Sequence, residues 1–332
     1  MPKISIFIPV FNAQNYLAEC LNSIRNQTFE NWECLIIDDG STDESTRIID
    51  TFLKSDARFK AFYVEHCGNI QKNKDFARSK ASGDWFFDVD ADDFLDLDCL
   101  EILINRQEQT NADIVLLQLK FINEQATQIL KKTPEDNFDF WQIISGQVAG
   151  MLTIGEWNIP ANGLFHKNLY TAANFDLSND TLNLDEYVSQ ALLFDAKLVA
   201  FCQAGYYYRQ HPKSRTKAPT LLRFAILYSD KLREELVILH FGEQSKEARI
   251  AKTASMRRFL GLYALFFQFK KRFSKDQKKH INALFSDTFK GFSKKEIWHS
   301  HLHFLKKWLL LLPRPFVVFG CKFYAFLKKV RP

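Results

Sequence analysis

The chain has 332 residues, of which 46% are hydrophobic and 25% are charged, and its formal net charge is +5. This length and apolar content allow a large buried core, so an intrinsically disordered chain is excluded. We expect one large domain, or one domain with an extension.

The charge is unevenly distributed along the chain. Residues 241–332 hold 21 Lys and Arg against 5 Asp and Glu, a net charge of +16, whereas residues 1–240 carry a net charge of −11. We therefore expect the two parts of the chain to meet different partners.

The cysteines predict a reduced protein. They form no C-x-x-C pair and no His/Cys cluster with zinc-ligand spacing, and each stands in an apolar stretch, which favours buried thiols in a cytoplasmic protein. The six cysteines are Cys20, Cys34, Cys67, Cys99, Cys202 and Cys321. The apolar run that ends at Pro9 is too short for the apolar region of a signal peptide, so we expect no export.

The first hundred residues alternate between strand and helix patterns. Short apolar runs predict strands at 3–10, 32–38, 59–65 and 84–90. Helical patterns fill the intervals, at 13–27, 41–53 and 70–82, and Ser41 to Glu44 has the form of a capping box. Strands joined by single helices predict an α/β fold, with a mostly parallel sheet and helices on both faces.

Acidic residues follow two of these strands. The second strand ends in Asp-Asp-Gly-Ser at 38–41, and four carboxylates end the fourth strand, at Asp88, Asp90, Asp92 and Asp93. The carboxyl ends of parallel strands meet at one edge of the sheet, where ligands bind. Carboxylates gathered there repel one another unless a cation compensates, which predicts a divalent ion that binds together with a phosphate ligand.

Two segments resemble the bacterial family-2 glycosyltransferases of the GT-A fold. They are SIFIPVFNAQNYLAECLNSIRNQTFENWECLIIDDGSTDES, residues 5–45, and ASGDWFFDVDADDF, residues 81–94. The resemblance runs from about residue 3 to residue 100, and later pieces extend it to about residue 214. It implies that this part of the chain binds a nucleotide-sugar, most often a UDP-sugar.

The resemblance also implies individual roles in donor binding. Pro9, with Phe11 close behind it, stands in the loop where the backbone of family members approaches uracil and ribose. Asp39 resembles the carboxylate that accepts a hydrogen bond from uracil N3–H. Lys72 takes the place of an arginine that faces the diphosphate, and Arg209 and Arg215 are candidates for neutralising the leaving group.

A metal site is implied at the end of the fourth strand. Asp90, Ala91 and Asp92 match the D-x-D element, which holds ribose and a Mn²⁺ or Mg²⁺ ion that bridges the diphosphate. Asp92 or Asp93 is the expected metal ligand, and His211 is a further candidate ligand. Asp88 is an addition, since family members usually have an apolar residue there; it either faces solvent or makes an unfamiliar contact.

The catalytic base is expected at the start of a later helix. Residues 182–201 resemble the segment in which a carboxylate of family members removes the proton from the acceptor hydroxyl. The order of the two acids is inverted here, to Asp185-Glu186. By position Glu186 matches the base, and by side-chain type Asp185 does, so both stay candidates.

Beyond about residue 221 the chain becomes helical, aromatic and basic. The apolar run from Trp308 to Phe326 is interrupted by prolines and cations, so a spanning helix is not expected. Interfacial helices on an anionic membrane surface fit this composition, and packing against a second subunit of a homo-oligomer is the alternative. No nucleic-acid-binding module is recognised.

Together these patterns predict an inverting, metal-dependent glycosyltransferase. We expect residues 1–220 to be the catalytic domain, with a nucleotide-binding half at 1–100 and an acceptor half at 101–220, and residues 221–332 to be a helical basic extension. The expected acceptor is a saccharide or lipid-linked glycan of lipopolysaccharide or capsule, at the inner face of the cytoplasmic membrane. The alternatives are a haloacid-dehalogenase-like phosphatase, which also uses a D-x-D after a strand, and a non-catalytic membrane scaffold with a degenerate site.

Overall fold

The computed structural model describes residues 3–172, 175, 183–211, 220–300 and 302–311. The chain divides into two compact units. The first is drawn from residues 1–152, 158–179 and 188–212, and the second from residues 153–157, 180–187 and 213–332. Whether residues 1–220 form a domain of their own, as the sequence predicts, stays a prediction.

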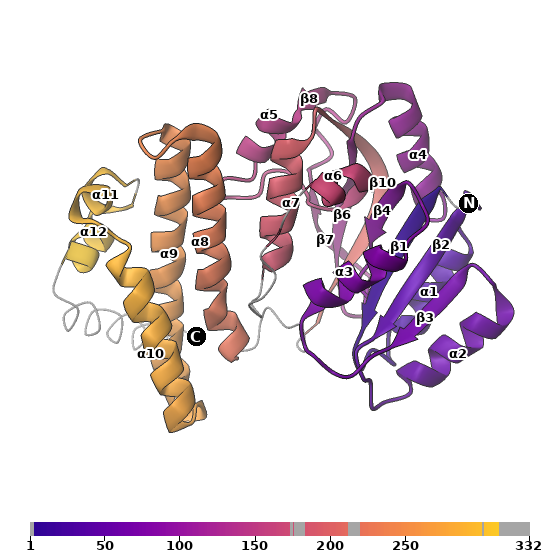
Figure 1. The fold of residues 1–332 in the computed structure, drawn as a ribbon, viewed down its shortest axis with the longest axis horizontal. Helices are drawn as coiled ribbons and strands as arrows, with labels where there is room; N and C mark the ends of the chain where they lie inside the picture. The colour runs from indigo at the N-terminus through magenta and orange to yellow at the C-terminus, as the bar shows by residue number, and fades with distance from the viewer. Residues whose placement is uncertain (1–2, 173–174, 176–182, 212–219, 301, 312–332) are drawn as a thin grey trace. The chain divides into compact units, whose positions relative to one another are not determined.

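The described part of the first unit is built on a ten-stranded sheet, one half of which is parallel (Figure 1). The order in this half is β3-β2-β1-β4. Its strands are β1 (Ile4–Val10), β2 (Trp32–Asp38), β3 (Phe59–Tyr63) and β4 (Trp85–Asp88). The helices that connect them are α1 (Leu17–Arg25), α2 (Ser45–Ser55) and α3 (Ile70–Lys80). The predicted alternation of strand and helix is confirmed.

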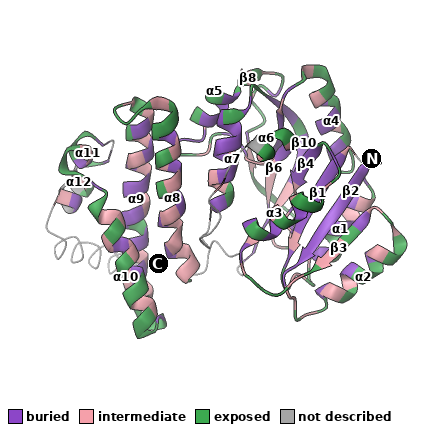
Figure 2. Cartoon of the chain, viewed as in Figure 1, coloured by how far each residue is buried: buried purple, intermediate pink, exposed green. Residues whose placement is uncertain are grey.

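Alternate side chains of these strands enter two separate cores. From β1, Ile6 and Ile8 face the core that contains residues of α1 and α2, whereas Phe7 faces the core that contains Ala77 of α3. A period of two is expected for strands that are covered on both faces. Strands β1, β2 and β4 are mostly buried (Figure 2), whereas the edge strand β3 is only partly buried. Each large apolar side chain buried in this way contributes about 1.5–3 kcal/mol.

The other half of the sheet is mixed. Strand β9 (Gly163–His166) is antiparallel to both β4 and β6 (Ile114–Asn123), and β10 (Leu198–Gln210) is parallel to β6. Three short antiparallel strands complete it, β5 (Phe94–Leu95), β7 (Ile129–Thr133) and β8 (Ile143–Ser145). The intervening helices are α4 (Cys99–Thr110), α5 (Gly146–Met151), α6 (Lys167–Ala172) and α7 (Leu184–Asp195).

The second unit is helical, as the sequence predicts. Its elements are α8 (Leu221–Phe241), α9 (Lys246–Phe269), the 3-10 turn η1 (Lys270–Arg272), α10 (Lys275–Lys290), α11 (Lys294–His299) and α12 (Phe304–Leu311). Helices α8, α9 and α10 enclose an aromatic core around Phe224, Phe259 and Phe285. Within the described ranges, no helix combines the length and the apolar character needed to cross a membrane. The expected interfacial segment from Trp308 to Phe326 lies largely outside the described residues.

The structure corrects the prediction that every cysteine is buried. Cys20, Cys34, Cys99 and Cys202 are buried, but Cys67 is exposed. It lies in the loop between β3 and α3, where its backbone N–H donates to a carboxylate at the rim of the sheet. Cys321 lies outside the described residues.

Candidate active site

The carboxyl ends of β1, β2 and β4 form one rim of the sheet. Because β1 lies between β2 and β4, the loops that follow these three strands are neighbours, and the outer two strands are about 10 Å apart. These loops carry Phe11, Asp39 and Asp90. The tertiary structure thus brings together the two acidic segments that the sequence analysis placed on one edge.

Asp39 is buried in a cradle of backbone donors. Its Oδ1 accepts from the N–H of Cys67 at 2.9 Å, and its Oδ2 accepts from the N–H of Gly68 at 3.0 Å. Burial alone would raise the pKa of Asp39, but these hydrogen bonds and one from Asn73 outweigh it and lower the pKa. Asp39 is therefore an ionised carboxylate that can accept a further hydrogen bond from a ligand.

The turn after β2 is fixed by local chemistry. Asp38 accepts from the N–H of Ser41 and from the hydroxyl of Thr46, so it is a structural residue of the turn. Gly40 has φ +71°, and a Cβ there would lie 3.1 Å from the backbone nitrogen of His66. The predicted capping box is absent, because α2 begins later and the Ser41 hydroxyl accepts from the N–H of Asn12 instead.

An aromatic pair lies beside Asp39. The rings of Phe11 and His66 are stacked, with centroids 4.1 Å apart, and both side chains are about half exposed. Nδ1 of His66 is 2.9 Å from Oδ2 of Asp39. An exposed ring face next to an ionised acceptor suits a planar base that stacks and donates one N–H. Pro9 itself is part of β1, where it lies opposite Ile37 in the register.

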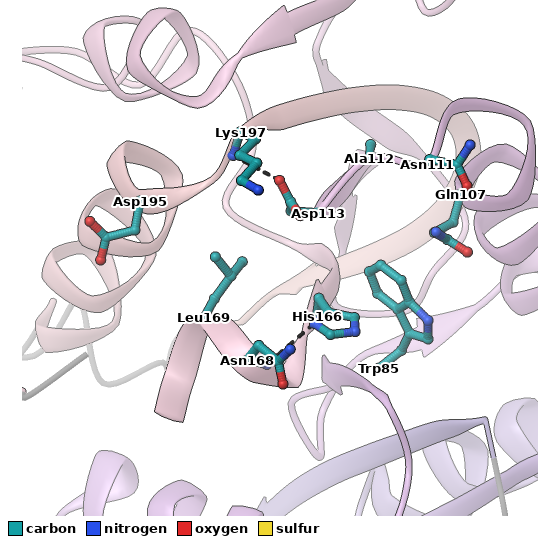
Figure 3. A pocket seen from close by; sticks show the side chains of 10 residues that line it. All are labelled: Trp85, Gln107, Asn111, Ala112, Asp113, His166, Asn168, Leu169, Asp195 and Lys197. Carbon is teal, nitrogen blue, oxygen red and sulfur yellow. Dashed lines mark hydrogen bonds between the residues drawn. The ribbon is translucent and has the colours of Figure 1, made fainter. Parts of the chain in front are cut away.

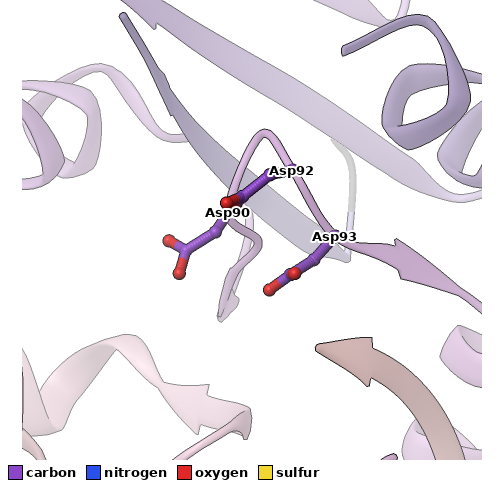
Figure 4. A group of neighbouring side chains, drawn as sticks. All are labelled: Asp90, Asp92 and Asp93. Carbon is purple, nitrogen blue, oxygen red and sulfur yellow. The ribbon is translucent and has the colours of Figure 1, made fainter. Parts of the chain in front are cut away.

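Three carboxylates cluster in the loop between β4 and β5 (Figure 4). One oxygen each of Asp90, Asp92 and Asp93 lies within 4.8 Å of the others. Asp90 and Asp92 are partly exposed, whereas Asp93 is buried. Burial, followed by the charges of Asp92 and Asp90, raises the pKa of Asp93 well above its usual range.

Strand β10 supplies the groups that hold this cluster. The hydroxyl of Tyr206 donates to Asp93 at 2.7 Å and accepts from the N–H of Asp90 at 3.0 Å. The N–H of Arg209 donates to the other oxygen of Asp93 at 2.8 Å. Nε2 of His211 is 2.8 Å from Oδ2 of Asp92. The family resemblance implied His211 at this loop and Arg209 at the leaving group, whereas no local pattern indicated Tyr206.

The guanidinium of Arg209 is engaged within the protein. The residue is only 4% exposed, its Nε donates to the carbonyl of Asp92 at 2.9 Å, and another nitrogen forms an ion pair with Glu19 at 2.5 Å. These contacts tie the acidic loop to α1. Arg215, the other predicted cation of this segment, lies outside the described residues.

The donor set of the acidic loop fits a divalent cation. Its ligands are three carboxylates within 4.8 Å of one another and the imidazole of His211, which contacts Asp92, and both kinds of group bind Mn²⁺ or Mg²⁺. Burial and then the charges of Asp92 and Asp90 raise the pKa of Asp93, and a doubly charged ion would relieve the repulsion among these carboxylates. Ala91 holds no ligand atom in its side chain and is buried between the acids.

A lysine on α3 approaches the same loop. Lys74 is buried, and its Nζ is 3.2 Å from Oδ2 of Asp88 and 3.9 Å from Oδ1 of Asp90. Lys72, the residue predicted to face the diphosphate, is exposed on the same helix. The helical spacing distinguishes the two lysines. Lys74 is three and four residues before Ala77 and Arg78 and lies on their buried face of α3, whereas Lys72 does not.

The candidate bases lie at the start of α7. Asp185 is exposed, whereas Glu186 is partly buried and forms an ion pair with Arg233 at 2.7 Å, with Arg258 3.9 Å away. Burial raises the pKa of Glu186, and the two arginines oppose this rise without cancelling it. Both residues fall in the second unit.

A separate pocket of about 450 Å³ lies at the opposite edge of the sheet (Figure 3). It is lined by residues near the start of β4 and β10 and the end of β9, among them Trp85, His166 and Lys197. Asp113 in its wall accepts hydrogen bonds from the N–H groups of Lys197 and Leu198. The pocket holds none of the predicted site residues.

Comparison with known proteins agrees with this geometry. The model of the family described as "Glycosyl transferase family 2" matches residues 5–159. The chain is 35% identical to glycosyltransferase GlyG of Streptococcus pneumoniae over 113 residues, which cover 34% of this chain and 38% of GlyG. It is 32% identical to an uncharacterized glycosyltransferase of Haemophilus influenzae over 154 residues, which cover 46% of this chain and 62% of that protein. The matched regions thus span less than two thirds of either relative.

The fold is also similar to a solved structure. The crystal structure of Staphylococcus aureus TarS 1-349 in complex with UDP-GlcNAc superposes with a TM-score of 0.68 at 15% sequence identity, covering 96% of this chain and 89% of that one. This likeness shows the fold, a central sheet flanked by helices with a helical C-terminal region, which is the expected GT-A architecture. Residues 5–159, just under half of the chain, are thus similar to glycosyltransferase family 2.

Proposed function

We propose that the protein is an inverting, metal-dependent glycosyltransferase that moves a sugar from a UDP-sugar to a saccharide hydroxyl. The observation that supports this most is the meeting of Asp39 and the cluster of Asp90, Asp92 and Asp93 on one rim of the sheet. An ionised acceptor beside exposed rings suits a nucleobase, and a carboxylate cluster suits a cation that binds a diphosphate. The match of residues 5–159 to family 2 supports the same conclusion, whereas the chemistry of a haloacid-dehalogenase phosphatase does not require Asp39.

The donor is proposed to lie along the rim from β2 to β4. Uracil N3–H would donate to Asp39, and the base would lie against Phe11 near Pro9. Ribose and diphosphate would then reach the loop of Asp90 and Ala91. Support comes from the neighbouring fold of TarS, whose crystal structure contains UDP-GlcNAc. The sugar itself, hexose or N-acetylhexosamine, is selected by other residues.

Asp92 and Asp93, with His211, would hold a Mn²⁺ or Mg²⁺ ion. Such an ion supplies Lewis-acid stabilisation of the departing diphosphate. The protein's own part is to fix the ligands: Tyr206 and the backbone of Arg209 hold Asp93, and His211 holds Asp92. Arg209 acts on the loop and not on the leaving group, because its guanidinium is committed to Glu19 and to Asp92.

A carboxylate at the start of α7 would remove the proton from the acceptor hydroxyl as that oxygen attacks the anomeric carbon. The hydroxyl attacks on the side opposite to the departing nucleotide, so this single displacement inverts the configuration at the anomeric carbon. Glu186 occupies the position that the family resemblance favours, and its raised pKa suits a base that works near neutral pH. Asp185 stays the alternative because it is the more exposed of the two.

The acceptor is proposed to be a lipid-linked glycan of lipopolysaccharide or capsule at the inner face of the cytoplasmic membrane. A basic turn, formed by η1 and the start of α10, supports contact with an anionic surface. Six cations stand there within ten residues, five of them are exposed, and none forms an ion pair with a described residue. They are Lys270, Lys271, Arg272, Lys275, Lys278 and Lys279. Exposed cations of this density attract anionic headgroups.

The function is tested with a panel of nucleotide-sugars in the presence of Mn²⁺. We expect slow hydrolysis of one UDP-sugar by the wild-type chain, and loss of UDP binding of at least tenfold for Asp39→Ala, measured by calorimetry. Release of phosphate from phosphomonoesters with unchanged activity of Asp39→Ala would support the phosphatase instead. Binding of neither UDP nor Mn²⁺ by the wild-type chain would leave the scaffold alternative.

A further inference from the structure

Asp88 is a charged residue at a position where the strand pattern calls for an apolar one. Side chains of β4 alternate between the two cores, and Phe86, two residues earlier, belongs to the core covered by α3. Asp88 therefore faces α3 and not solvent, and its side chain is 30% exposed. The alternation of strand faces thus decides which element Asp88 meets.

Two cations of α3 converge on this carboxylate. Nζ of Lys74 and Nη2 of Arg78 each lie 3.2 Å from Oδ2 of Asp88, and both cationic side chains are only 8% exposed. The residues are four apart on the helix, so they share one face. Arg78 has a second partner in Asp75, at 2.8 Å. Lys74 reaches toward the acidic cluster, with Asp90 at 3.9 Å.

We propose that Asp88 is a positioning residue that holds the ammonium of Lys74 at the rim beside Asp90, where it meets the diphosphate of the donor. This inference rests on the proposed function. A lysine side chain is flexible along its four carbons. A fixed carboxylate in contact with the ammonium confines the positive charge to one place. In an apolar version of this site, Lys74 would lose the carboxylate at 3.2 Å and keep the more distant Asp90, at 3.9 Å.

The alternative is that Asp88 only stabilises the fold, and a double-mutant cycle distinguishes the two roles. The variants are Asp88→Asn, Lys74→Met and the double variant, with UDP and UMP binding measured by calorimetry at a fixed Mn²⁺ concentration. We expect each single variant to weaken UDP binding by roughly five- to twentyfold and UMP binding by less than threefold. The double variant should bind UDP no more weakly than Lys74→Met, because the two residues act as one unit.

The matched control is Asp75→Asn, which removes the other acid bound to Arg78 and should leave UDP binding within twofold of wild type. Asp88→Glu should recover part of the UDP affinity. Equal losses for UDP and UMP, or independent losses that multiply in the double variant, overturn the positioning role. If Asp88→Asn does not fold, the Lys74→Met variant provides the test. An unchanged ratio of UDP to UMP affinity in Lys74→Met would also overturn the positioning role. A wild-type chain that binds neither nucleotide overturns the proposed function itself.

Discussion

The hydroxyl of Tyr206 donates a hydrogen bond of 2.7 Å to Asp93, which lies 113 residues earlier in the chain. The same hydroxyl accepts from the N–H of Asp90, so one buried side chain of β10 fixes both ends of the acidic loop. The conformation of the acidic loop therefore depends on β10, a strand that lies more than a hundred residues later in the sequence.

Tyr206→Phe tests this relationship. The change removes the oxygen and leaves Asp93 and the N–H of Asp90 without that partner, so we expect a loss of about 1–3 kcal/mol in unfolding free energy. We also expect weaker Mn²⁺ binding, by roughly tenfold, because Asp93 loses its orientation. Thermal unfolding and Mn²⁺ titration measure the two effects. Tyr207→Phe on the same strand, whose hydroxyl contacts Asp96 instead, is the control and should keep Mn²⁺ affinity.

Glu186→Gln is expected to reduce kcat by about 10²–10⁴-fold if Glu186 is the general base. UDP affinity should stay unchanged, since the donor is proposed to lie along the rim of the first unit. In the wild-type enzyme, kcat should fall as pH drops through the raised pKa of Glu186, because the base must be ionised.

Asp185→Asn is the matched variant and should lose less than tenfold in kcat. The reverse order of the two effects would assign the base to Asp185. Equal losses in UDP affinity for both variants would contradict a role in proton transfer altogether.

The lowered pKa of Glu33 leads us to expect that the folded state loses stability in acid. Burial by itself would raise its pKa, but hydrogen bonds from Lys60, Ser82 and Ser5 lower the pKa to about 2. A group whose folded pKa lies below its unfolded value stabilises the fold above the unfolded pKa of 4.5. This contribution is lost as pH falls from about 4.5 toward 2.

Glu33→Gln checks this by comparison with wild type. The difference in unfolding free energy between the two should be largest at pH 6–7 and should shrink below pH 4.5, as measured by urea unfolding across the pH range. A difference that stays constant with pH would show that packing, and not ionisation, is what the substitution removes.

The basic turn predicts charge-dependent binding to membranes. Reversing Lys271, Arg272 and Lys275 to Glu should reduce co-sedimentation with anionic vesicles at least tenfold, since each cation near such a surface contributes about 1 kcal/mol. Binding to neutral phosphatidylcholine vesicles should be low for both forms, and added salt should weaken the wild-type interaction.

The control carries the same change of charge elsewhere in the second unit, at the exposed Lys246, Lys294 and Lys295. Equal losses in both triple variants would mean that net charge alone drives the attraction. Undiminished sedimentation of the first variant would rule out the turn as the contact surface. Tighter binding to nucleic acid than to vesicles would point to a different partner.

The sequence by itself determined the parallel half of the fold and the edge of the sheet at which the candidate site residues meet. Apolar runs of period two and helical stripes are local signals, and the rule that parallel strands end on one edge placed Asp39 beside the acids after β4. The family motifs then supplied roles for these residues, because they lie in contiguous stretches that a sequence can show.

Only the tertiary structure decided which groups hold these residues. Tyr206, Lys74 and the cradle of Cys67 and Gly68 act through contacts between segments far apart in the chain, and no local pattern encodes such pairs. The face on which Asp88 lies also depended on which helix covers β4. Side-chain direction and long-range pairing are properties of packing, and packing is settled only when the whole core assembles.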